Sequence, residues 1–229
     1  MKKNLLITGA TGYIGSHAVV GFERLGYKTI LIDNFSNSSR ESLSGIAKIL
    51  GYLPEFFQWD IQDEPFLRNI FGKYTFDGVI HFAGLKAVWE SCDNPLLYYQ
   101  NNISGSITLF RIMEEYSVKK IILSSSATVY HSDNLGDLDE GMKVWSNSPY
   151  GTTKLVLEYI LSDMALFQDW SSCILRYFNP IGADPSGYIG EIPNGIPNNL
   201  LPYIFDVALG KREYISIYGD DYKTKDGTG

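Results

Sequence analysis

A tyrosine and a lysine stand four residues apart at Tyr150 and Lys154. In a helix, residues at this spacing share one face and lie about 6 Å apart along the axis. A free tyrosine has a pKa of about 10 and is a poor base at neutral pH, but a nearby ammonium group and an oxidised nicotinamide lower that pKa. Such a pair can take a proton from an alcohol while a hydride leaves the same carbon. The spacing also occurs in ordinary surface pairs, so it needs support from other residues.

Three serines, Ser124 to Ser126, end a predicted strand over residues 119–125. A serine hydroxyl at that strand end can hydrogen-bond both a substrate oxygen and the Tyr150 hydroxyl. The alternative interpretation is a polar turn at the end of the strand. No G-x-S-x-G motif surrounds these serines, which argues against a serine hydrolase. Serine, tyrosine and lysine together therefore favour an oxidation or reduction at a hydroxyl-bearing carbon.

A glycine-rich loop, residues 9–15 (GATGYIG), lies between a predicted strand and a predicted helix. Glycines let the backbone approach a pyrophosphate, and the helix that follows offers free N–H groups and a positive dipole end. The spacing is one residue longer than the commonest dinucleotide fingerprint. Asp33 ends the second predicted strand, where a carboxylate can accept the adenosine ribose hydroxyls and repel a 2′-phosphate. The pattern favours NAD over NADP, although a tight strand–helix turn would also use these glycines.

Two further strand ends are candidate cofactor contacts, because a ligand lies across the carboxyl ends of such strands. They are Asp60 with Ile61, and Phe82 to Gly84. Position alone leaves two alternatives open, namely that Asp60 caps a helix and that Phe82 belongs to the core.

The predicted elements alternate between strand and helix, which indicates an α/β fold with a Rossmann-like, doubly wound parallel sheet. Five prolines and four glycines fall within residues 180–202. We therefore expect an NAD-binding domain over residues 1–179 and the beginning of a smaller, loop-rich substrate-binding region over 180–229. The expected strands are 4–8, 29–33, 55–61, 77–83, 119–125 and 173–178. The expected helices are 13–25, one that follows the loop 34–40 and ends near Gly51, 63–74, one long helix capped by Asn94, and 150–167.

Composition narrows the class of protein. The chain has 229 residues and a net charge of −7, so it lacks the basic footprint of a nucleic-acid or anionic-membrane binder. Its two cysteines, Cys92 and Cys173, exclude a disulfide framework and favour a reducing, cytoplasmic setting. The three histidines, at 17, 81 and 131, have no ligand spacing, so we expect no metal site. His81 lies on a buried strand and is expected to be a hydrogen-bonded core residue.

These residues resemble the extended short-chain dehydrogenase/reductase family, and from HFAGLKAV onward they are similar to its UDP-glucose 4-epimerases. The matching segments cover nearly the whole chain: TGATGYIGSH, IDNFSNS, VIHFAGLKAV, YYQNNISG, SSSATVY, SPYGTTK, LRYFNPIGADPSG and GIPNNLLPYI. The resemblance implies transient oxidation of a UDP-sugar at C4 by NAD, interconverting UDP-galactose and UDP-glucose in galactose metabolism without net redox change. It also implies a homodimer built from the helices near 95–116 and 150–167.

The roles implied by the resemblance fall on matching positions. Ser126, Tyr150 and Lys154 would be catalytic. The implied NAD contacts are Gly9, Gly12, Tyr13, Ile14, Gly15, Asp33, Asn34, Asp60, Ile61, Phe82, Ala83, Gly84, Lys86, Asn101, Tyr150, Lys154 and Phe178. The implied contacts to the UDP-sugar are Ser126, Tyr150, Phe178, Asn179, Asn199, Leu200 and Tyr218.

Some positions depart from the family or separate it from relatives. The dehydratases that resemble this family carry an Asp-Glu pair where this chain has Ala127 and Thr128, which disfavours a dehydration. Trp89 and His131 stand where the family has glycine, so Trp89 is expected to crowd the pocket and His131 to occupy a backbone position suited to glycine. The family also continues beyond Gly229, so the alternative hypothesis is a truncated, non-catalytic NAD-binding remnant.

Overall fold

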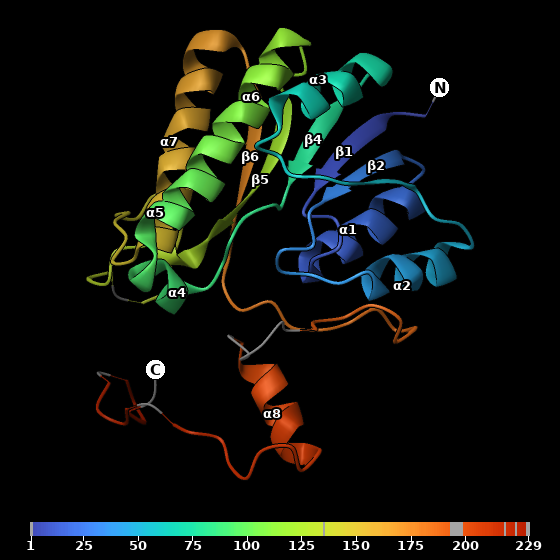
Figure 1. Cartoon of the computed structure of the whole chain (residues 1–229). Helices are drawn as coiled ribbons and strands as arrows, with labels where there is room; N and C mark the ends of the chain where they lie inside the picture. The colour runs from blue at the N-terminus through green and yellow to red at the C-terminus, as the bar shows by residue number, and fades with distance from the viewer. Residues whose placement is uncertain (1, 135, 193–198, 218, 223, 228–229) are drawn as a thin grey trace. The chain divides into compact units, whose positions relative to one another are not determined.

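The computed structural model describes residues 2–134, 136–192, 199–217, 219–222 and 224–227 (Figure 1). The chain divides into two compact units, Met1–Ile192 and Pro193–Gly229. The first unit contains the sheet and seven of the described α-helices. In the second unit the described residues form one helix, α8 (Leu200–Ala208), none of whose residues is buried. The functional division after residue 179 remains a prediction.

A six-stranded, fully parallel sheet forms the centre of the first unit, and its strand order is β3-β2-β1-β4-β5-β6. This order is that of dinucleotide-binding folds, in which ligands bind where the order reverses, at the carboxyl ends of the strands. The prediction of a Rossmann-like fold is therefore confirmed. The strands are β1 (Asn4–Thr8), β2 (Lys28–Asp33), β3 (Glu55–Gln58), β4 (Gly78–His81), β5 (Lys120–Ser126) and β6 (Ser171–Tyr177).

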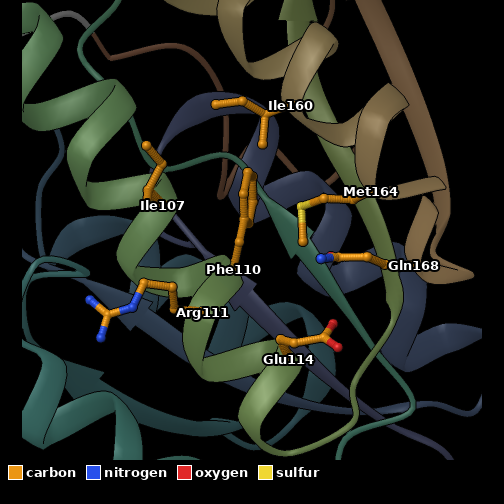
Figure 2. Close-up of a pocket in the computed structure, with 7 residues that line it drawn as sticks. All are labelled: Ile107, Phe110, Arg111, Glu114, Ile160, Met164 and Gln168. Atoms are coloured by element: carbon orange, nitrogen blue, oxygen red, sulfur yellow. The ribbon is translucent and has the colours of Figure 1, made fainter. Parts of the chain in front are cut away.

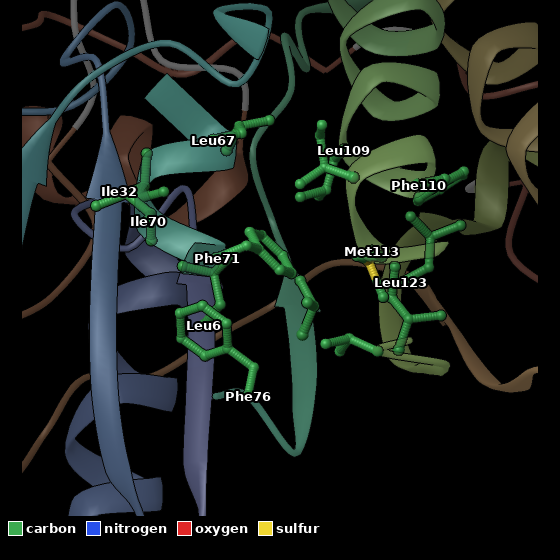
Figure 3. Packing of buried hydrophobic residues seen from close by; sticks show 14 of the residues in the cluster. Leu6, Ile32, Leu67, Ile70, Phe71, Phe76, Leu109, Phe110, Met113 and Leu123 are labelled. Carbon is green, nitrogen blue, oxygen red and sulfur yellow. The ribbon is translucent and has the colours of Figure 1, made fainter. Parts of the chain in front are cut away.

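Helices cover both faces of the sheet and enclose two separate apolar cores (Figure 1). On one face, α1 (Tyr13–Arg24) and α2 (Glu41–Leu50) pack against β1, β2 and β4. On the other face, α3 (Glu64–Lys73), α6 (Gly105–Glu115) and α7 (Pro149–Gln168) pack against the same sheet. Figure 3 shows this second core, where residues such as Leu67, Phe71 and Leu109 meet side chains of the strands. Because both faces are covered there, the central strands β1, β2 and β4 are largely apolar and buried.

The segment after β4 differs from the expected single helix. It forms α4 (Val88–Asp93), α5 (Pro95–Tyr98) and a π-helical turn (Tyr99–Ser104) before α6. Pro95 is the first residue of α5 as expected, but the predicted cap is wrong, because the Asn94 side chain makes no capping hydrogen bond. π-Helical turns inside helices are rare and often lie at functional sites. This one carries Asn101 and Asn102.

Candidate active site

The glycine loop brings three segments of backbone into close contact. Gly9 has a φ of +67°, and a β-carbon there would lie 2.6 Å from the Ala83 nitrogen. A β-carbon on Gly15 would lie 2.0 Å from the Gly9 carbonyl oxygen, so α1 approaches β1 more closely than any side chain allows. Gly12 is the N-cap of α1 and supplies no side-chain cap. The first-turn N–H groups, at Tyr13 and Ile14, thus form a cradle that fits an anionic pyrophosphate.

Asp33 lies at the carboxyl end of β2 and organises the loops around this cradle. Its buried carboxylate accepts hydrogen bonds from the Thr11 N–H (3.0 Å), the Phe35 N–H (2.9 Å) and the Ser38 hydroxyl (3.0 Å). A carboxylate has about four acceptor positions, so one remains for a ligand. The sequence predicts two ribose contacts at Asp33. In the structure Asp33 mainly orders the surrounding loops, because three of its acceptor positions are used by Thr11, Phe35 and Ser38.

The expected adenosine side is assembled by a side-chain contact between two strand ends. The Asn34 amide donates to an Asp60 carboxylate oxygen at 2.8 Å, and the other Asp60 oxygen accepts the Gln62 N–H at 2.8 Å. Asp60 is not a helix cap, because that position belongs to Asp63, whose carboxylate accepts the Phe66 N–H. Ile61 is buried.

The expected nicotinamide side follows β4. The Ala83 N–H donates to the Thr8 hydroxyl, and Gly84 lies against Asn102 and Lys154, since a β-carbon there would lie 3.3 Å from Asn102 Oδ1 and 3.6 Å from Lys154 Nζ. Phe82 is partly buried against the core that α1 and α2 enclose. Lys86 is more exposed and lies 3.7 Å from a carboxylate oxygen of Glu191.

Asn102 is a site residue that the sequence analysis missed. It is buried, its Oδ1 accepts the Leu85 N–H at 2.8 Å, and its Nδ2 donates to the Leu85 carbonyl and the Thr153 hydroxyl. The predicted residue Asn101 donates to Asn102. Asn102 therefore joins the loop after β4 to α7, next to Lys154. Its sequence signal is its place in the polar run from Gln100 to Asn102, next to the predicted contact Asn101.

The Ser–Tyr–Lys group is assembled where β5 ends and α7 begins. Ser126 is the last residue of β5, one residue beyond the predicted end of the strand. The N-cap Ser148 accepts the Gly151 N–H at 3.1 Å and so starts α7, which carries Tyr150 in its first turn. The buried Lys154 ammonium donates to the Ser124 carbonyl at 2.8 Å and lies 5.9 Å from the centroid of the Tyr150 ring. The hydrogen bond from Lys154 to Ser124 thus joins the beginning of α7 to the end of β5, and Tyr150 and Lys154 lie in one helix as their spacing predicts.

Burial controls the electrostatics of this group. It raises the pKa of Tyr150 above its usual value of 10, and a hydrogen bond with Ser126 opposes that shift. Burial also lowers the pKa of Lys154 to about 8, because desolvation disfavours the ammonium form. Lys154 is not among the groups that shift the pKa of Tyr150, because its ammonium is turned to a backbone carbonyl rather than to the phenol oxygen. The predicted lowering of the Tyr150 pKa, which needs an oxidised nicotinamide as well, stays a prediction.

His81 lies beneath the site as the core residue that the sequence predicts. Its Nδ1 is 2.6 Å from the Thr8 hydroxyl and its Nε2 is 2.8 Å from the Ser106 hydroxyl, which donates to the Asn102 carbonyl. Complete burial lowers its pKa to about 3, so the imidazole is neutral. Among the described residues, no three histidine, cysteine or carboxylate side chains gather as a metal site.

An aromatic wall stands beside Ser126 at the end of β6. Phe178 is 59% exposed and stacks on Tyr130, with ring centroids 6.1 Å apart. The Arg176 guanidinium lies over the Tyr130 ring, 4.8 Å from its centroid. It also forms a bidentate pair with the buried Glu158. Sequence analysis identified Phe178 but missed this pair, because the two residues come from different elements.

The remaining predicted substrate contacts are only partly described. Asn179 is exposed and follows β6 directly. Asn199, the N-cap of α8, and Leu200, its first residue, belong to the second unit. Tyr218 lies outside the described residues. Because Ser126 pairs in register with Tyr177, Asn179 follows the strand next to Ser126, whereas the roles of Asn199, Leu200 and Tyr218 stay predictions.

The two departures from the family have mild structural consequences. Trp89 lies in α4 and is 83% exposed, so it does not fill the space around Lys86 as expected. His131 is not among the residues with positive φ, so the predicted need for glycine there is wrong. The His131 Nδ1 instead accepts the Asp133 N–H at 3.0 Å. Among the described helices, none is long and apolar enough to span a membrane.

A parallel sheet in this strand order, with a glycine cradle and a Ser–Tyr–Lys group at one rim, defines a Rossmann-like dinucleotide-binding fold. A family model described as GDP-mannose 4,6 dehydratase matches residues 6–229. UDP-glucose 4-epimerase 2 of Arabidopsis thaliana is 49% identical over all of this chain and 67% of its own length. The UDP-glucose 4-epimerase of Bacillus subtilis is 50% identical over 98% of this chain and 67% of its own length.

A solved structure gives the same result. The UDP-glucose 4-epimerase of Stenotrophomonas maltophila, with bound NAD and formylated UDP-arabinopyranose, matches with a TM-score of 0.95 and 44% identity over 99% of this chain and 68% of that one. The chain therefore belongs to the UDP-glucose 4-epimerase family. It spans about two thirds of the length of the relatives it matches.

Proposed function

We propose that this chain interconverts UDP-galactose and UDP-glucose with NAD as its cofactor. The observation that carries the proposal is the Ser126–Tyr150–Lys154 group, assembled beside the glycine cradle in a chain about half identical to UDP-glucose 4-epimerases. A tyrosine in contact with a serine hydroxyl, with a buried lysine behind it, suits proton transfer at a sugar hydroxyl.

The residues at the strand ends fit NAD. The close approaches at Gly9 and Gly15 leave room for a pyrophosphate and for no side chain, and Asp33 keeps one acceptor position for a ribose hydroxyl. A 2′-phosphate there would meet a buried carboxylate, which supports NAD over NADP. When bound, NAD would supply a reversible hydride acceptor and a positive ring charge. The contacts proposed for it are those named in the sequence analysis.

In this proposal Tyr150 moves the proton. In its phenolate form Tyr150 would take the proton of the sugar 4′-hydroxyl and later return it, while the Ser126 hydroxyl holds the sugar 4′-oxygen in line. Lys154 keeps positive charge near the Tyr150 ring without a direct contact to the phenol oxygen. Phe178 forms a wall for the sugar, and Asn179, Asn199, Leu200 and Tyr218 are proposed to hold the UDP part, so that remote binding energy anchors the substrate.

Two alternatives remain open to the same experiment. The residues after Ser126 argue against a dehydratase, because neither Ala127 nor Thr128 carries the carboxyl group that dehydration needs at these positions. The Thr128 hydroxyl instead donates to Ser126 at 3.0 Å. A non-catalytic NAD-binding protein would keep the cradle and lack conversion.

Dimerisation and location belong to the proposal as well. Between α6 and α7 there is a pocket of about 300 Å³, lined by Ile107, Phe110, Arg111, Glu114, Ile160, Met164 and Gln168 and containing none of the candidate catalytic residues (Figure 2). Apolar side chains beside it on α7, such as Phe167 at 77% exposure, support packing against a second copy of the chain. Both cysteines are free, which supports a reducing, cytoplasmic setting.

The direct test is to incubate the NAD-loaded chain with UDP-galactose, without added reductant, and to follow UDP-glucose. We expect conversion that is lost in Tyr150→Phe, whose NAD content and fold are unchanged. A folded chain that retains NAD and gives no conversion would leave the non-catalytic alternative. Light scattering of the parent and of Ile160→Glu tests the dimer, since a charge in the pocket should leave monomers.

A further inference from the structure

Beneath the candidate active site, one buried ion pair connects the three segments that carry Ser126, Tyr150 and Phe178. Glu158 lies on α7, one turn beyond Lys154 and two turns beyond Tyr150. Its carboxylate accepts the hydroxyl of Ser125, the neighbour of Ser126. It also accepts Arg176 Nε at 3.1 and 3.2 Å and Arg176 Nη2 at 2.7 Å. The pair therefore joins α7 to both β5 and β6.

The guanidinium of Arg176 also supports the aromatic wall. Arg176 pairs in register with Ser125, so its backbone lies one strand away from the serine run. One face of its guanidinium lies 4.8 Å from the centroid of the Tyr130 ring, and Tyr130 stacks on Phe178. Arg176 Nη1 is buried and has no hydrogen-bond acceptor within ordinary geometry among the described residues. Tyr130 nevertheless raises the pKa of Arg176, after the larger contribution of Glu158, so the Tyr130 hydroxyl as well as its ring faces the guanidinium. Only a planar guanidinium makes the bidentate pair and the ring contact together.

Stability alone does not account for this pair. Burying two charges costs about as much as their attraction returns, so apolar residues of similar volume often serve stability equally well. What the pair provides is a fixed orientation, because two oxygens, two nitrogens and a ring plane must all match. The side chains are 94% and 83% buried at Glu158 and Arg176, so water does not relax that match.

We propose that Arg176 is a positioning residue, which through Glu158 and Tyr130 holds Ser126, Tyr150 and Phe178 in the arrangement that the reaction needs. The inference rests on the proposed function for its kinetic consequence. It does not rest on that function for its structural one, which is that Ser126 stays in contact with Tyr150 only while the pair is intact.

A set of four variants tests the proposal. Arg176→Lys keeps the charge and removes the bidentate and stacking geometry. Tyr130→Leu removes the ring, whereas Tyr130→Phe keeps its face. Arg68→Lys is the matched control, because Arg68 makes the same bidentate pair with Glu115, at 3.1, 3.0 and 2.9 Å, on the exposed surface between α3 and α6.

In the NAD-loaded chain we expect Arg176→Lys and Tyr130→Leu to lower kcat for UDP-galactose at least tenfold, with KM within about threefold and NAD content unchanged. Arg68→Lys should match the parent, and Tyr130→Phe, which keeps the ring and loses only the hydroxyl beside Arg176, should fall by less than Tyr130→Leu. The proposal is overturned if Arg176→Lys keeps its kcat, or if Tyr130→Phe falls as far as Tyr130→Leu.

A second measurement separates this inference from the proposed function. With tyrosines labelled at Cζ, the Tyr150 resonance, assigned by its loss in Tyr150→Phe, reports the phenol's environment by NMR. Losing the Ser126 contact in Arg176→Lys should shift this resonance and raise the pKa of Tyr150, whereas Arg68→Lys should change neither. A parent without epimerase activity refutes the proposed function only. An unchanged Tyr150 resonance in Arg176→Lys refutes the positioning role in an active or inactive parent.

Discussion

Two glycines in α1 offer a controlled test of the cofactor cradle. At Gly15 an added β-carbon would lie 2.0 Å from the Gly9 carbonyl oxygen, whereas at Gly21 nothing lies within 4 Å. Both positions are helical, so alanine contributes the same propensity gain of about 0.5–1 kcal/mol at each. Since ordinary contact begins at 3.4 Å, α1 must move by roughly 1.4 Å in Gly15→Ala.

Such overpacking costs about 1–3 kcal/mol. Because the propensity gain cancels between the variants, Gly15→Ala should be less stable than Gly21→Ala by that amount. For a chain of this size the difference is a Tm gap of roughly 2–12 °C. Thermal unfolding by circular dichroism measures the gap, and calorimetric titration with NAD measures the cradle. We expect Gly21→Ala to melt about 1–4 °C above the parent with unchanged affinity. Gly15→Ala should bind NAD at least tenfold more weakly. Equal Tm and equal NAD affinity in the two variants would refute the close-approach argument.

Three other predictions follow from single side chains. Asp33→Asn turns an amide donor toward either the Thr11 or the Phe35 N–H, because these two groups bond different carboxylate oxygens. It should therefore lose about 1–3 kcal/mol in urea unfolding and weaken NAD binding. Lys154→Met should be more stable than the parent at pH 7, because burial lowers the pKa of Lys154 to about 8 and so penalises the buried ammonium. Between pH 8 and 10.5 this advantage should disappear, because the folded parent releases the proton while the unfolded parent still holds it. His81, with its pKa lowered to about 3, should make the parent lose stability as pH falls from 6.5 toward 3, since the unfolded chain binds the proton first. In His81→Gln that part of the acid sensitivity should be absent, so a parallel loss of Tm in both proteins would contradict the assignment.

The sheet could be predicted from sequence because its signals are local. The apolar run at residues 4–8 becomes β1 with those bounds, since a strand buried on both faces is a continuous apolar run that ends at glycines. Helical periodicity likewise predicted that Tyr150 and Lys154 lie on one face of a helix, and both residues belong to α7. Where the apolar pattern is weaker, the predicted ends of elements are less accurate. The strand predicted over 55–61, for example, ends at Gln58 as β3.

Features that depend on tertiary contacts could not be read in this way. The break into α4, α5 and a π-helical turn serves buried contacts of Asn102 and Tyr98, which are made with segments outside that stretch or across it. The Glu158–Arg176 pair depends on the register of β5 and β6. α8 was missed because prolines and glycines dominate the segment before it.

The pKa of Tyr150 shows how burial, which the sequence does not give, changes a prediction made from spacing. Spacing puts an ammonium near a phenol, and the sequence predicts that this ammonium together with an oxidised nicotinamide lowers the pKa of Tyr150. Burial instead disfavours both charges, raising the pKa of Tyr150 and lowering that of Lys154. The hydrogen bond with Ser126 acts in the opposite direction and lowers the pKa of Tyr150. A bound nicotinamide would add positive charge near Tyr150, so NAD binding is expected to lower that pKa further.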